Sequence, residues 1–332
     1  MSTTFNAIMV REGAEGKPQA ALETLSASDL PGLPVSVAVE YSTMNYKDAL
    51  AVSGKAPICR KLPMVCGIDL AGTVTKSADP RFAPGDTVLV NGYGMSEVHW
   101  GGYTQHQNLN PDWIVKVPEA FTTETAMAIG TAGYTAMLSV MALQDHGVKP
   151  GDGPIAVSGA SGGVGSVALM LLSKLGYEAV AISGRPEENR AHFEALGATD
   201  VAARADFDRK SKPLEKERFA GAVDSVGSLT LAALLAQTKY EGVVAACGLA
   251  GGADLPSTVM PFILRGVTLR GIDSVMAPME KRVRAWEMLA DLLSVDALTS
   301  MYRVVPMSDV FDLATDLLGG KVTGRLVVDV NA

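Results

Sequence analysis

The residues best suited to chemistry form a glycine-rich turn, Gly159-Ala160-Ser161-Gly162-Gly163-Val164-Gly165. The turn follows the apolar run 155–158 and opens the segment 164–175, whose apolar residues recur at helical spacing. Glycines let a backbone approach a phosphate closely, and the free N–H groups of a helix N-terminus attract anions. This context favours a dinucleotide-binding turn over an ordinary strand-to-helix turn. The residues expected to contact the pyrophosphate are Ser161, Gly162, Gly163 and Val164.

The end of the next predicted strand, 178–183, indicates which dinucleotide binds. Chains that prefer NAD usually carry Asp or Glu there, to bind the ribose 2′-hydroxyl. This sequence has Ser183-Gly184-Arg185 instead. A hydroxyl can hydrogen-bond a 2′-phosphate and a guanidinium can neutralise it, whereas a carboxylate would repel it. The pattern predicts NADPH as the cofactor, with Arg204 as a further phosphate ligand. A solvated surface charge is the alternative role for Arg185.

The segments around the glycine turn alternate between strand and helix patterns. Such alternation is typical of a parallel sheet with helices on both faces, and it predicts a Rossmann domain over residues 124–298. The expected strands are 155–158, 178–183, 222–226 and 242–247, and the expected helices are 124–145, 164–175, 187–196 and 228–238.

The first third of the chain has a different pattern. Short strand-like runs, such as 35–39, 69–74 and 87–90, are separated by Pro and Gly, which predicts a β-rich or barrel-like unit. The end of the chain reads as strand, helix and strand, and we expect it to pair back onto this unit. The β-rich domain is therefore predicted to be discontinuous, with residues 1–123 and 299–332.

The composition limits the possible function classes. The chain has 332 residues, 48% of them hydrophobic and 19% charged, which is enough to build the cores of two domains. Its formal net charge of −8 argues against general nucleic-acid binding, because phosphate contacts need a basic face. No secretory signal or membrane span is expected, and three scattered cysteines indicate a reducing compartment. These features predict a cytoplasmic protein without a nucleic-acid or membrane partner.

Several further motifs resemble the medium-chain dehydrogenase/reductase superfamily. Together they are similar to its zinc-free acryloyl-CoA reductase (NADPH) branch, which lies close to the quinone reductases. The resemblance spans essentially the whole chain and implies an α/β fold with a GroES-like catalytic domain and a Rossmann cofactor domain. The motifs are Asn45-Tyr46-Lys47-Asp48, Pro63-Met64-Val65-Cys66-Gly67-Ile68-Asp69, Gly85-Asp86, Trp100-Gly101-Gly102-Tyr103, Gly130-Thr131-Ala132-Gly133-Tyr134-Thr135-Ala136 and Val259-Met260-Pro261-Phe262-Ile263-Leu264-Arg265-Gly266-Val267.

One departure separates this sequence from the zinc enzymes that it resembles. The positions matching their catalytic zinc ligands carry Asn45, Ile68 and Thr131, which offer neither imidazole nor thiolate. We therefore expect no metal site. Without a Lewis acid, reduction of an activated alkene is favoured over alcohol oxidation. The predicted reaction adds hydride from NADPH to the β-carbon of an α,β-unsaturated CoA thioester, and hydrogen bonds to the thioester oxygen stabilise the enolate.

The resemblance also implies roles for individual residues. Tyr46 is expected to contact the nicotinamide end of the cofactor, and we favour this role over proton donation. Asn45 is expected to hydrogen-bond the substrate or the nicotinamide ribose. Two thiols in apolar contexts, Cys66 and Cys247, are expected to be inert by burial. Further cofactor contacts are implied for Ser225, Leu249, Ile263 and Ser274. A homodimer joined at the edge strand 266–271 is expected.

Three functions remain open from the sequence alone. The first is an NADPH-dependent acryloyl-CoA reductase, and the second is a quinone or other enone reductase on the same scaffold. The third is a non-catalytic NADPH-binding or structural protein that keeps the fold. The glycine turn and the Ser183–Arg185 pair favour the first two, because a purely structural role would not require them.

Overall fold

The structure, a computed structural model, describes residues 4–13 and 16–332 of the chain. It divides into two compact units. The first, here called the β-rich unit, comprises Met1–Thr131, Ser274–Ala290 and Ser294–Ala332. The second, here called the parallel-sheet unit, comprises Ala132–Asp273 and Asp291–Leu293.

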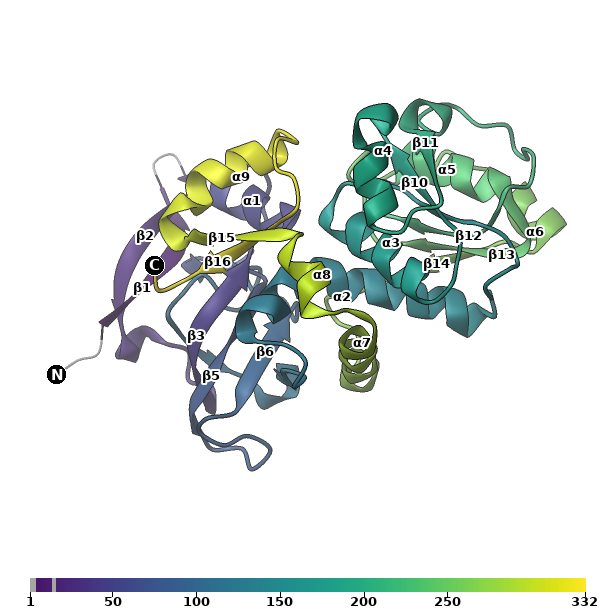
Figure 1. The fold of residues 1–332 in the computed structure, drawn as a ribbon. Coiled ribbons are helices and arrows are strands. Elements are labelled where there is room, and N and C mark those ends of the chain that lie inside the picture. The colour runs from purple at the N-terminus through teal and green to yellow at the C-terminus, as the bar shows by residue number, and fades with distance from the viewer. Residues whose placement is uncertain (1–3, 14–15) are drawn as a thin grey trace. The chain divides into compact units, whose positions relative to one another are not determined.

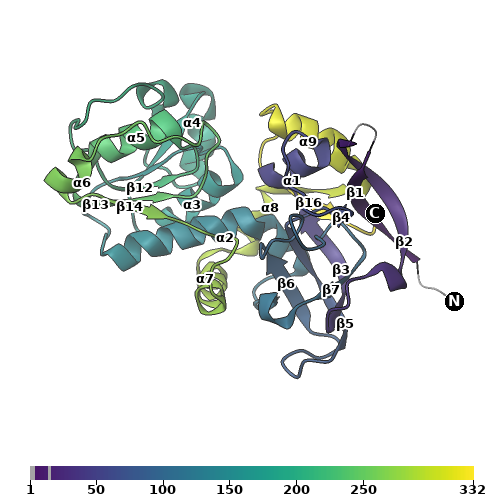
Figure 2. The ribbon, with the colours of Figure 1, turned by 180° about the vertical axis from the view of Figure 1, so that it is seen from behind.

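The parallel-sheet unit is built around one sheet with the strand order β11-β10-β9-β12-β13-β14, in which neighbouring strands are parallel. The chain moves from β9 to β10 and β11 on one side, and then to β12, β13 and β14 on the other. Because parallel crossovers are right-handed, this reversal places helices on both faces of the sheet (Figures 1 and 2). The strands are β9 (Ile155–Val157), β10 (Ala179–Ser183), β11 (Asp200–Ala203), β12 (Phe219–Asp224), β13 (Thr238–Ala246) and β14 (Thr268–Gly271), and the helices are α3 (Gly163–Lys174), α4 (Pro186–Ala195), α5 (Ser228–Gln237) and α6 (Met260–Arg265).

The β-rich unit contains two sheets. One has the order β2-β1-β4, and the other has the order β15-β16-β3-β5-β6-β8 with β7 beside β3. As predicted, the end of the chain returns to this unit, where the yellow strand β16 pairs with the purple strand β3 (Figure 1). The strands are β1 (Thr4–Glu12), β2 (Pro18–Ser26), β3 (Val35–Thr43), β4 (Met64–Val65), β5 (Asp69–Ser77), β6 (Thr87–Asn91), β7 (His106–Leu109), β8 (Val115–Lys116), β15 (Tyr302–Pro306) and β16 (Arg325–Asp329). The helices are α1 (Tyr46–Ser53), α7 (Met279–Leu292), α8 (Val295–Thr299) and α9 (Val310–Leu318).

The segment Ser274–Ala290 differs from the predicted domain boundaries. It belongs to the β-rich unit, although the sequence pattern placed it within a cofactor domain of residues 124–298. Two buried side chains of α7 explain the difference. The Arg282 guanidinium donates a hydrogen bond of 2.7 Å to the Asn91 carbonyl, and the Trp286 indole donates one of 3.2 Å to the Asn91 side chain. These contacts join α7 to the end of β6.

Helix α2 (Thr123–His146) passes from the β-rich unit into the parallel-sheet unit. Its backbone breaks at Gly130, which has φ 51° and ψ −162°. A Cβ atom at this glycine would lie 2.7 Å from a methyl group of Thr43 and 2.8 Å from the Arg325 guanidinium. The helix is long and apolar enough to cross a membrane, but 94% of its most apolar window is buried. Core helices pass the same test of length and composition, so α2 is weak evidence for a membrane span.

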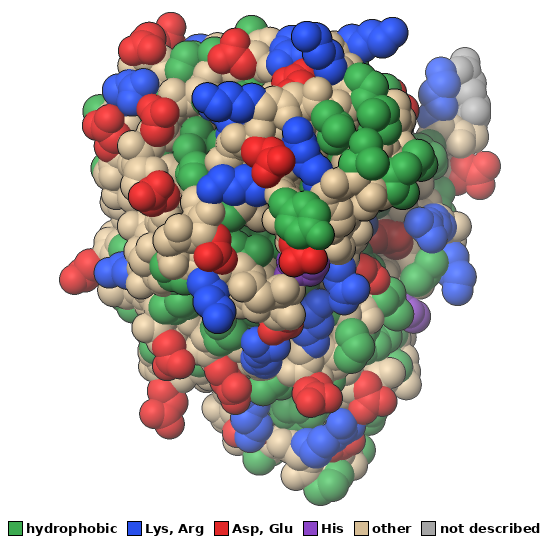
Figure 3. All heavy atoms as spheres, turned by 90° about the vertical axis from the view of Figure 1, so that its right-hand side faces the viewer, with side chains coloured by type: hydrophobic (Ala, Val, Ile, Leu, Met, Phe, Trp, Pro, Cys, Tyr) green, Lys and Arg blue, Asp and Glu red, His purple; other side chains and the backbone are tan. Residues whose placement is uncertain are grey.

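Charge is mixed on the surface drawn in Figure 3. Basic and acidic side chains of the described residues are interspersed on this face, with hydrophobic side chains between them. This face therefore carries no extended field of one sign.

Candidate functional site

The glycine turn joins β9 to α3 and leaves the first N–H groups of the helix open. Gly162 is the N-cap residue and Gly163 begins the helix. A Cβ atom at Gly165 would lie 2.4 Å from the Gly159 carbonyl oxygen, so the turn can close this tightly only with glycine at this position. Ser161 and Gly162 are exposed. The turn therefore presents backbone donors and the positive end of a helix dipole, which suit a phosphate.

Ser183 and Arg185 stand at the carboxyl end of β10. The Ser183 hydroxyl oxygen accepts a 3.1 Å hydrogen bond from the Arg185 backbone N–H, so its own proton remains available for an oxyanion. The Arg185 side chain is 66% exposed, and its nearest carboxylate, Glu188, lies at 3.9 Å. Because this ion pair is exposed to solvent and its charged atoms are 3.9 Å apart, it restrains the Arg185 guanidinium only weakly.

Arg204 approaches the same point from the neighbouring strand. It follows β11, which pairs with β10 in parallel register from Val180 opposite Asp200 to Ser183 opposite Ala203. The central guanidinium carbon lies 3.2 Å from where a Cβ atom of Gly184 would be. The bare backbone of Gly184 thus lets Arg204 lie across the end of β10. Arg204 therefore lies at the end of β10 beside Gly184, which stands between Ser183 and Arg185 at the turn into α4, where the sequence lacks the usual acid.

The carboxyl edge of the parallel sheet brings most of the predicted cofactor residues together. Ser225 follows β12, and its hydroxyl donates to the Ser158 carbonyl at 3.2 Å, beside the glycine turn. Leu249 follows β13 and is exposed. Because carboxyl ends of parallel strands meet at one edge, these residues share that edge with Ser161 and Ser183. The residues there fit a phosphorylated dinucleotide, through helix N–H groups, hydroxyls and guanidinium groups.

Two predicted cofactor residues do not belong to this group. Ile263 is exposed on α6. Ser274 belongs to the β-rich unit, where its carbonyl accepts a hydrogen bond from Arg282. Their contact with a cofactor stays a prediction.

A buried carboxylate that the sequence analysis did not single out supports the sheet edge. Asp224 ends β12 and is fully buried. It accepts hydrogen bonds of 2.6 Å from the Ser158 hydroxyl and 2.9 Å from the Gly227 N–H. It therefore connects the residue before the glycine turn to the loop after β12. An Asp at the end of an apolar strand is the signal that could have found it.

The β-rich unit contains a second polar cluster, centred on the fully buried Asp69 of β5. One Asp69 oxygen accepts hydrogen bonds of 2.6 Å from Asn91 and 2.5 Å from the Thr131 hydroxyl. The other accepts 2.7 Å from the Asn45 amide and 3.2 Å from the Thr131 N–H. Four donors therefore hold this carboxylate.

Asn45 is the N-cap residue of α1, and both of its amide protons are engaged. The side-chain nitrogen donates to Asp69 at 2.7 Å and to Asp48 at 3.0 Å, and the side-chain oxygen faces Arg325 at 3.4 Å. Both amide protons are therefore committed to carboxylates, and none is left for a substrate oxygen. Asn45 was expected to hydrogen-bond the substrate or the nicotinamide ribose. Its side-chain oxygen can still accept a hydrogen bond, for example from a ribose hydroxyl, and this contact stays a prediction.

Arg325, on β16, supplies the cation of this cluster. The guanidinium is buried and donates 2.8 Å to the Thr43 hydroxyl and 3.1 Å to the Ala128 carbonyl. Burial lowers the pKa of Arg325, while Asp69 and Asp48 act in the opposite direction. Nothing local in the sequence distinguishes Arg325 from other strand arginines, so its role could not be predicted from the sequence.

Asp48 completes the capping box of α1 and is fully buried. Its oxygens accept from the Asn45 N–H at 2.9 Å and from the Ile68 N–H at 2.9 Å. Burial and the neighbouring Asp69 raise the pKa of Asp48 to about 7, although these N–H groups act to lower it. The box fixes the first turn of α1, which begins with Tyr46.

Tyr46 itself projects from this turn. It is 53% exposed, and its hydroxyl makes no hydrogen bond with the other described residues. The next residue, Lys47, is held by an ion pair of 2.7 Å with Glu97. The phenol is therefore available to a ligand while its helix is anchored from both sides.

The three positions that match zinc ligands in the related enzymes do not fit a metal. Asn45 and Thr131 donate to Asp69, and Ile68 contributes only a backbone N–H to Asp48. Within residues 4–13 and 16–332, no group of three or more His, Cys, Asp or Glu side chains could hold a metal ion. Hydrogen bonds and Arg325 occupy the space that ligands would need.

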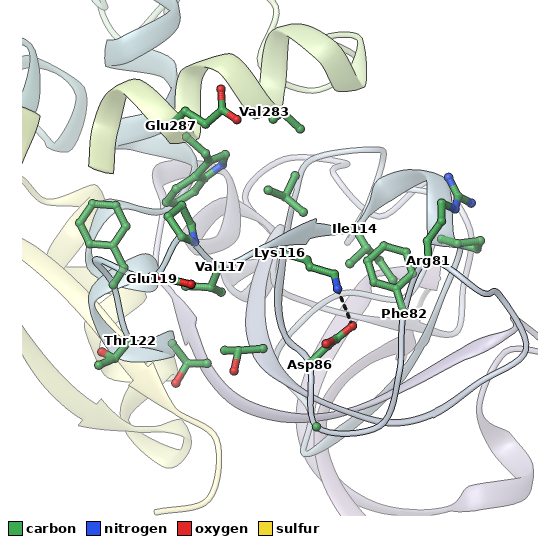
Figure 4. A pocket seen from close by; sticks show the side chains of 18 of the residues that line it. Arg81, Phe82, Asp86, Ile114, Lys116, Val117, Glu119, Thr122, Val283 and Glu287 are labelled. Carbon is green, nitrogen blue, oxygen red and sulfur yellow. Dashed lines mark ion pairs between the residues drawn. The ribbon is translucent and has the colours of Figure 1, made fainter. Parts of the chain in front are cut away.

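A hollow of about 1100 Å³ in the β-rich unit lies elsewhere (Figure 4). Lys116 and Asp86 pair across it at 2.8 Å, with Phe82 and Val283 in its lining. None of the predicted site residues lines it. The hollow therefore contributes nothing to the cofactor edge or to the Asp69 cluster.

Comparison with known proteins identifies relatives over the whole chain. Residues 163–292 match the family described as zinc-binding dehydrogenase, and residues 33–119 match the alcohol dehydrogenase GroES-like domain. With the parallel sheet, these matches confirm the predicted α/β fold class. A Ruegeria pomeroyi protein named acrylyl-CoA reductase AcuI is 54% identical over 330 residues, covering 99% of this chain and 100% of the relative.

Two solved structures share the fold closely. The crystal structure of Escherichia coli K-12 YhdH with bound NADPH has a TM-score of 0.94 and 50% identity, covering 98% of this chain and 100% of that chain. The Bacillus subtilis protein yhfP with NAD bound has a TM-score of 0.94 and 41% identity, covering 99% and 100%. These two structures were solved with different dinucleotides.

Proposed function

Because the chain belongs to the medium-chain dehydrogenase/reductase superfamily, we propose that it reduces the activated C=C bond of acryloyl-CoA to propanoyl-CoA with NADPH. The observation that carries the proposal is its similarity, over its full length, to the Ruegeria acrylyl-CoA reductase. The arrangement of Ser183, Arg185 and Arg204 supports NADPH as the reductant.

The proposed roles follow from what each group can bind. The turn Ser161–Val164 and the start of α3 would hold the pyrophosphate, and the end of β10 with Arg204 would hold the 2′-phosphate. When bound, NADPH supplies the hydride that adds to the β-carbon of the thioester. Asn45 acts by position, because its amide protons tie Asp69 and Asp48 to the start of α1. Tyr46, at the start of α1, offers its exposed phenol to the cofactor.

Steady-state rates with NADPH test this function. We expect a higher kcat/KM with acryloyl-CoA than with a small quinone. A higher value with the quinone would favour the enone or quinone reductase instead. If the protein binds NADPH, followed by nucleotide fluorescence, but turns over neither substrate, the non-catalytic alternative would be supported.

Replacing the Tyr46 hydroxyl separates its two possible roles. If the hydroxyl only contacts the cofactor, Tyr46→Phe should raise the NADPH Kd by about one neutral hydrogen bond, ~1 kcal/mol, with kcat largely intact. This is the result we expect, because water or the cofactor ribose can relay the proton. If the hydroxyl is the proton donor, kcat should instead fall by about 10²–10⁴-fold. A variant with both values unchanged would remove Tyr46 from the site.

Metal removal should leave the reductase fully active. The three positions that correspond to ligands in zinc enzymes carry Asn45, Ile68 and Thr131. The Asn45 amide and the Thr131 hydroxyl donate hydrogen bonds to Asp69, and the alkyl side chain of Ile68 cannot bind a metal. Exhaustive chelation followed by metal analysis and rate measurement tests this. Stoichiometric zinc, with activity lost on its removal, would contradict the zinc-free assignment.

We also propose that the chain forms a homodimer in the cytoplasm. Strand β14 has β13 as a neighbour on one side and ends the sheet order. The apolar side chains of Val259, Ile263 and Leu264, on and beside the preceding helix α6, are more than half exposed. An open strand edge beside apolar side chains favours pairing with a second copy. Sedimentation should give the mass of two chains, and a monomer at micromolar concentration would contradict the proposal.

The three free cysteines support a reducing compartment.

A further inference from the structure

A group of charged side chains adjoins Tyr46 in the β-rich unit. Glu97 lies at its centre and is buried, with a side chain only 12% exposed. One of its carboxylate oxygens pairs with the Lys47 ammonium at 2.7 Å, and the other pairs with the Arg60 guanidinium at 3.3 Å. Lys61 directly follows Arg60 and is exposed. These four residues, Lys47, Arg60, Lys61 and Glu97, are here called the Glu97 cluster.

Cations outnumber carboxylates in this cluster. One carboxylate serves two of the three cations, and among the described residues no ion pair joins Lys61 to an acidic side chain. Arg81, elsewhere in the same unit, shows the opposite balance, because it pairs with two carboxylates, Asp79 and Asp112. The Glu97 cluster therefore keeps positive charge that its own members do not neutralise.

The exposed fraction of the side chains increases outwards from the Glu97 carboxylate. It is 12% for Glu97, 34% for Lys47 and 69% for Arg60. A lysine ammonium has three N–H donors and a guanidinium has five, and Glu97 pairs with one nitrogen of each. The buried carboxylate thus fixes the two cations and leaves most of their donors for another partner.

The loop that carries Glu97 has an unusual backbone conformation. Tyr93 has φ 50° and Ser96 has φ 66°, values that residues with side chains rarely adopt. The Tyr93 N–H donates to the Val275 carbonyl at 2.9 Å, and the Ser96 N–H donates to the His99 carbonyl at 2.8 Å. Strained conformations of this kind cluster at ligand sites, where the surrounding structure holds them. The loop is an observation independent of the charge balance.

A second loop brings Arg60 and Lys61 to this place. The Arg60 N–H donates to the Glu97 carbonyl at 2.8 Å, and the Trp100 indole donates to the Pro63 carbonyl at 3.2 Å. These two contacts hold the segment 60–63 on either side of Lys61. The two loops therefore present the cations of the cluster from a fixed backbone.

We infer that the Glu97 cluster binds the phosphate groups of the coenzyme A part of the substrate, an inference that rests on the proposed function. Coenzyme A carries a diphosphate and a 3′-phosphate at one end of a pantetheine arm, and the reacting thioester lies at the other end. Lys47 directly follows Tyr46, so the cluster begins beside the phenol proposed to meet the cofactor and ends in exposed cations. Guanidinium and ammonium groups that are not fully neutralised suit phosphate oxygens. Arg60 and Lys61 contact the phosphates, and Glu97 holds Arg60 in place.

Steady-state rates with two thioesters test this inference. Acryloyl-pantetheine carries the reacting group and the arm but no phosphate. In Arg60→Ala and in Lys61→Ala, the ratio of kcat/KM for acryloyl-CoA to kcat/KM for acryloyl-pantetheine should fall by about three- to tenfold, as expected for the loss of an exposed charge contact. The change should appear in the KM for acryloyl-CoA, and the NADPH Kd should stay the same. Raising the salt concentration should lower the same ratio in the unmodified protein, because salt screens charge contacts.

Two further variants serve as controls. Arg60→Lys keeps the charge and should retain most of the ratio, although an ammonium cannot reproduce the fork of the guanidinium. Lys76→Ala removes an exposed charge from the same unit, at the opposite end of β5 from Asp69, and should leave the ratio unchanged.

Calorimetric titration with coenzyme A itself measures the phosphate site without turnover. We expect the Arg60→Ala and Lys61→Ala variants to bind coenzyme A about three- to tenfold more weakly than the unmodified protein does. An unchanged thioester ratio in both variants, or an equal loss with acryloyl-pantetheine, would overturn the inference and leave the cluster as a set of solvated ion pairs. So would a failure of the unmodified protein to bind coenzyme A. If neither thioester is reduced but both variants bind coenzyme A more weakly, the proposed function falls and the phosphate site stands.

Discussion

Arg325→Met should lower the free energy of unfolding by about 3–5 kcal/mol, because it leaves buried carboxylates without their cation. The guanidinium is 5% exposed, and the carboxylates of Asp48 and Asp69 beside it are fully buried. Methionine has a similar length but carries no charge, and it leaves the Thr43 hydroxyl and the Ala128 carbonyl without their donor. Chemical denaturation followed by tryptophan fluorescence measures the loss.

The pH dependence of this loss has a definite sign. With its pKa raised to about 7 from 3.8, Asp48 keeps its proton in the folded state at pH values where the unfolded chain has released it. The free energy of unfolding therefore falls as the pH rises between these values. Removing the Arg325 cation makes the ionised carboxylates less favourable still. The destabilisation should be larger at about pH 8 than at about pH 6.

Two controls make the result specific. Arg325→Lys keeps the charge and should lose less stability than the Met variant, although it cannot reproduce the fork of guanidinium contacts. Arg303→Met removes an exposed arginine from the neighbouring strand β15 and should change stability by no more than about 0.5 kcal/mol. Equal losses in the Arg325 and Arg303 variants, or a loss independent of pH, would contradict the role of the buried charge.

Arg185→Ala and Arg204→Ala should each weaken NADPH binding by roughly 1.5–3 kcal/mol and leave NADH binding nearly unchanged. Each change removes a cation that can meet the 2′-phosphate, which NADH lacks. The double variant should bind the two dinucleotides with similar Kd. Fluorescence titration of both cofactors at two salt concentrations measures this, because charge contacts weaken as salt rises.

Arg190→Ala is the matched control for this pair. Arg190 lies on α4, in the same unit, and is 38% exposed near Glu194 and Asp200. Its removal changes the net charge equally but takes nothing from the end of β10. Its NADPH Kd should stay close to that of the unmodified protein. Equal losses for NADPH and NADH in the Arg185 variant would overturn the assignment of NADPH.

The sequence alone determined the parts of this protein that depend on neighbouring residues. The glycine turn, the helix that it opens, and the Ser183-Gly184-Arg185 end of the next strand were all readable, because β9, α3 and β10 follow one another along the chain. Backbone conformation, helix capping and the carboxyl end of a strand are local properties. The same holds for the absence of imidazole and thiolate at the ligand-like positions, since this needs only residue types.

Tertiary structure decided the rest, because burial and charge compensation depend on residues that are distant in the chain. Asn45 meets Asp69 across 24 positions, and this contact, together with that to Asp48, occupies both amide protons of a residue expected to bind the substrate or the nicotinamide ribose. The sequence pattern placed the α7 segment in the cofactor domain, and only the contacts of Arg282 and Trp286 with Asn91 show that it joins the β-rich unit. A hydrophobic pattern predicts that one face of a helix or strand is buried, but only the tertiary structure shows which other element packs against that face.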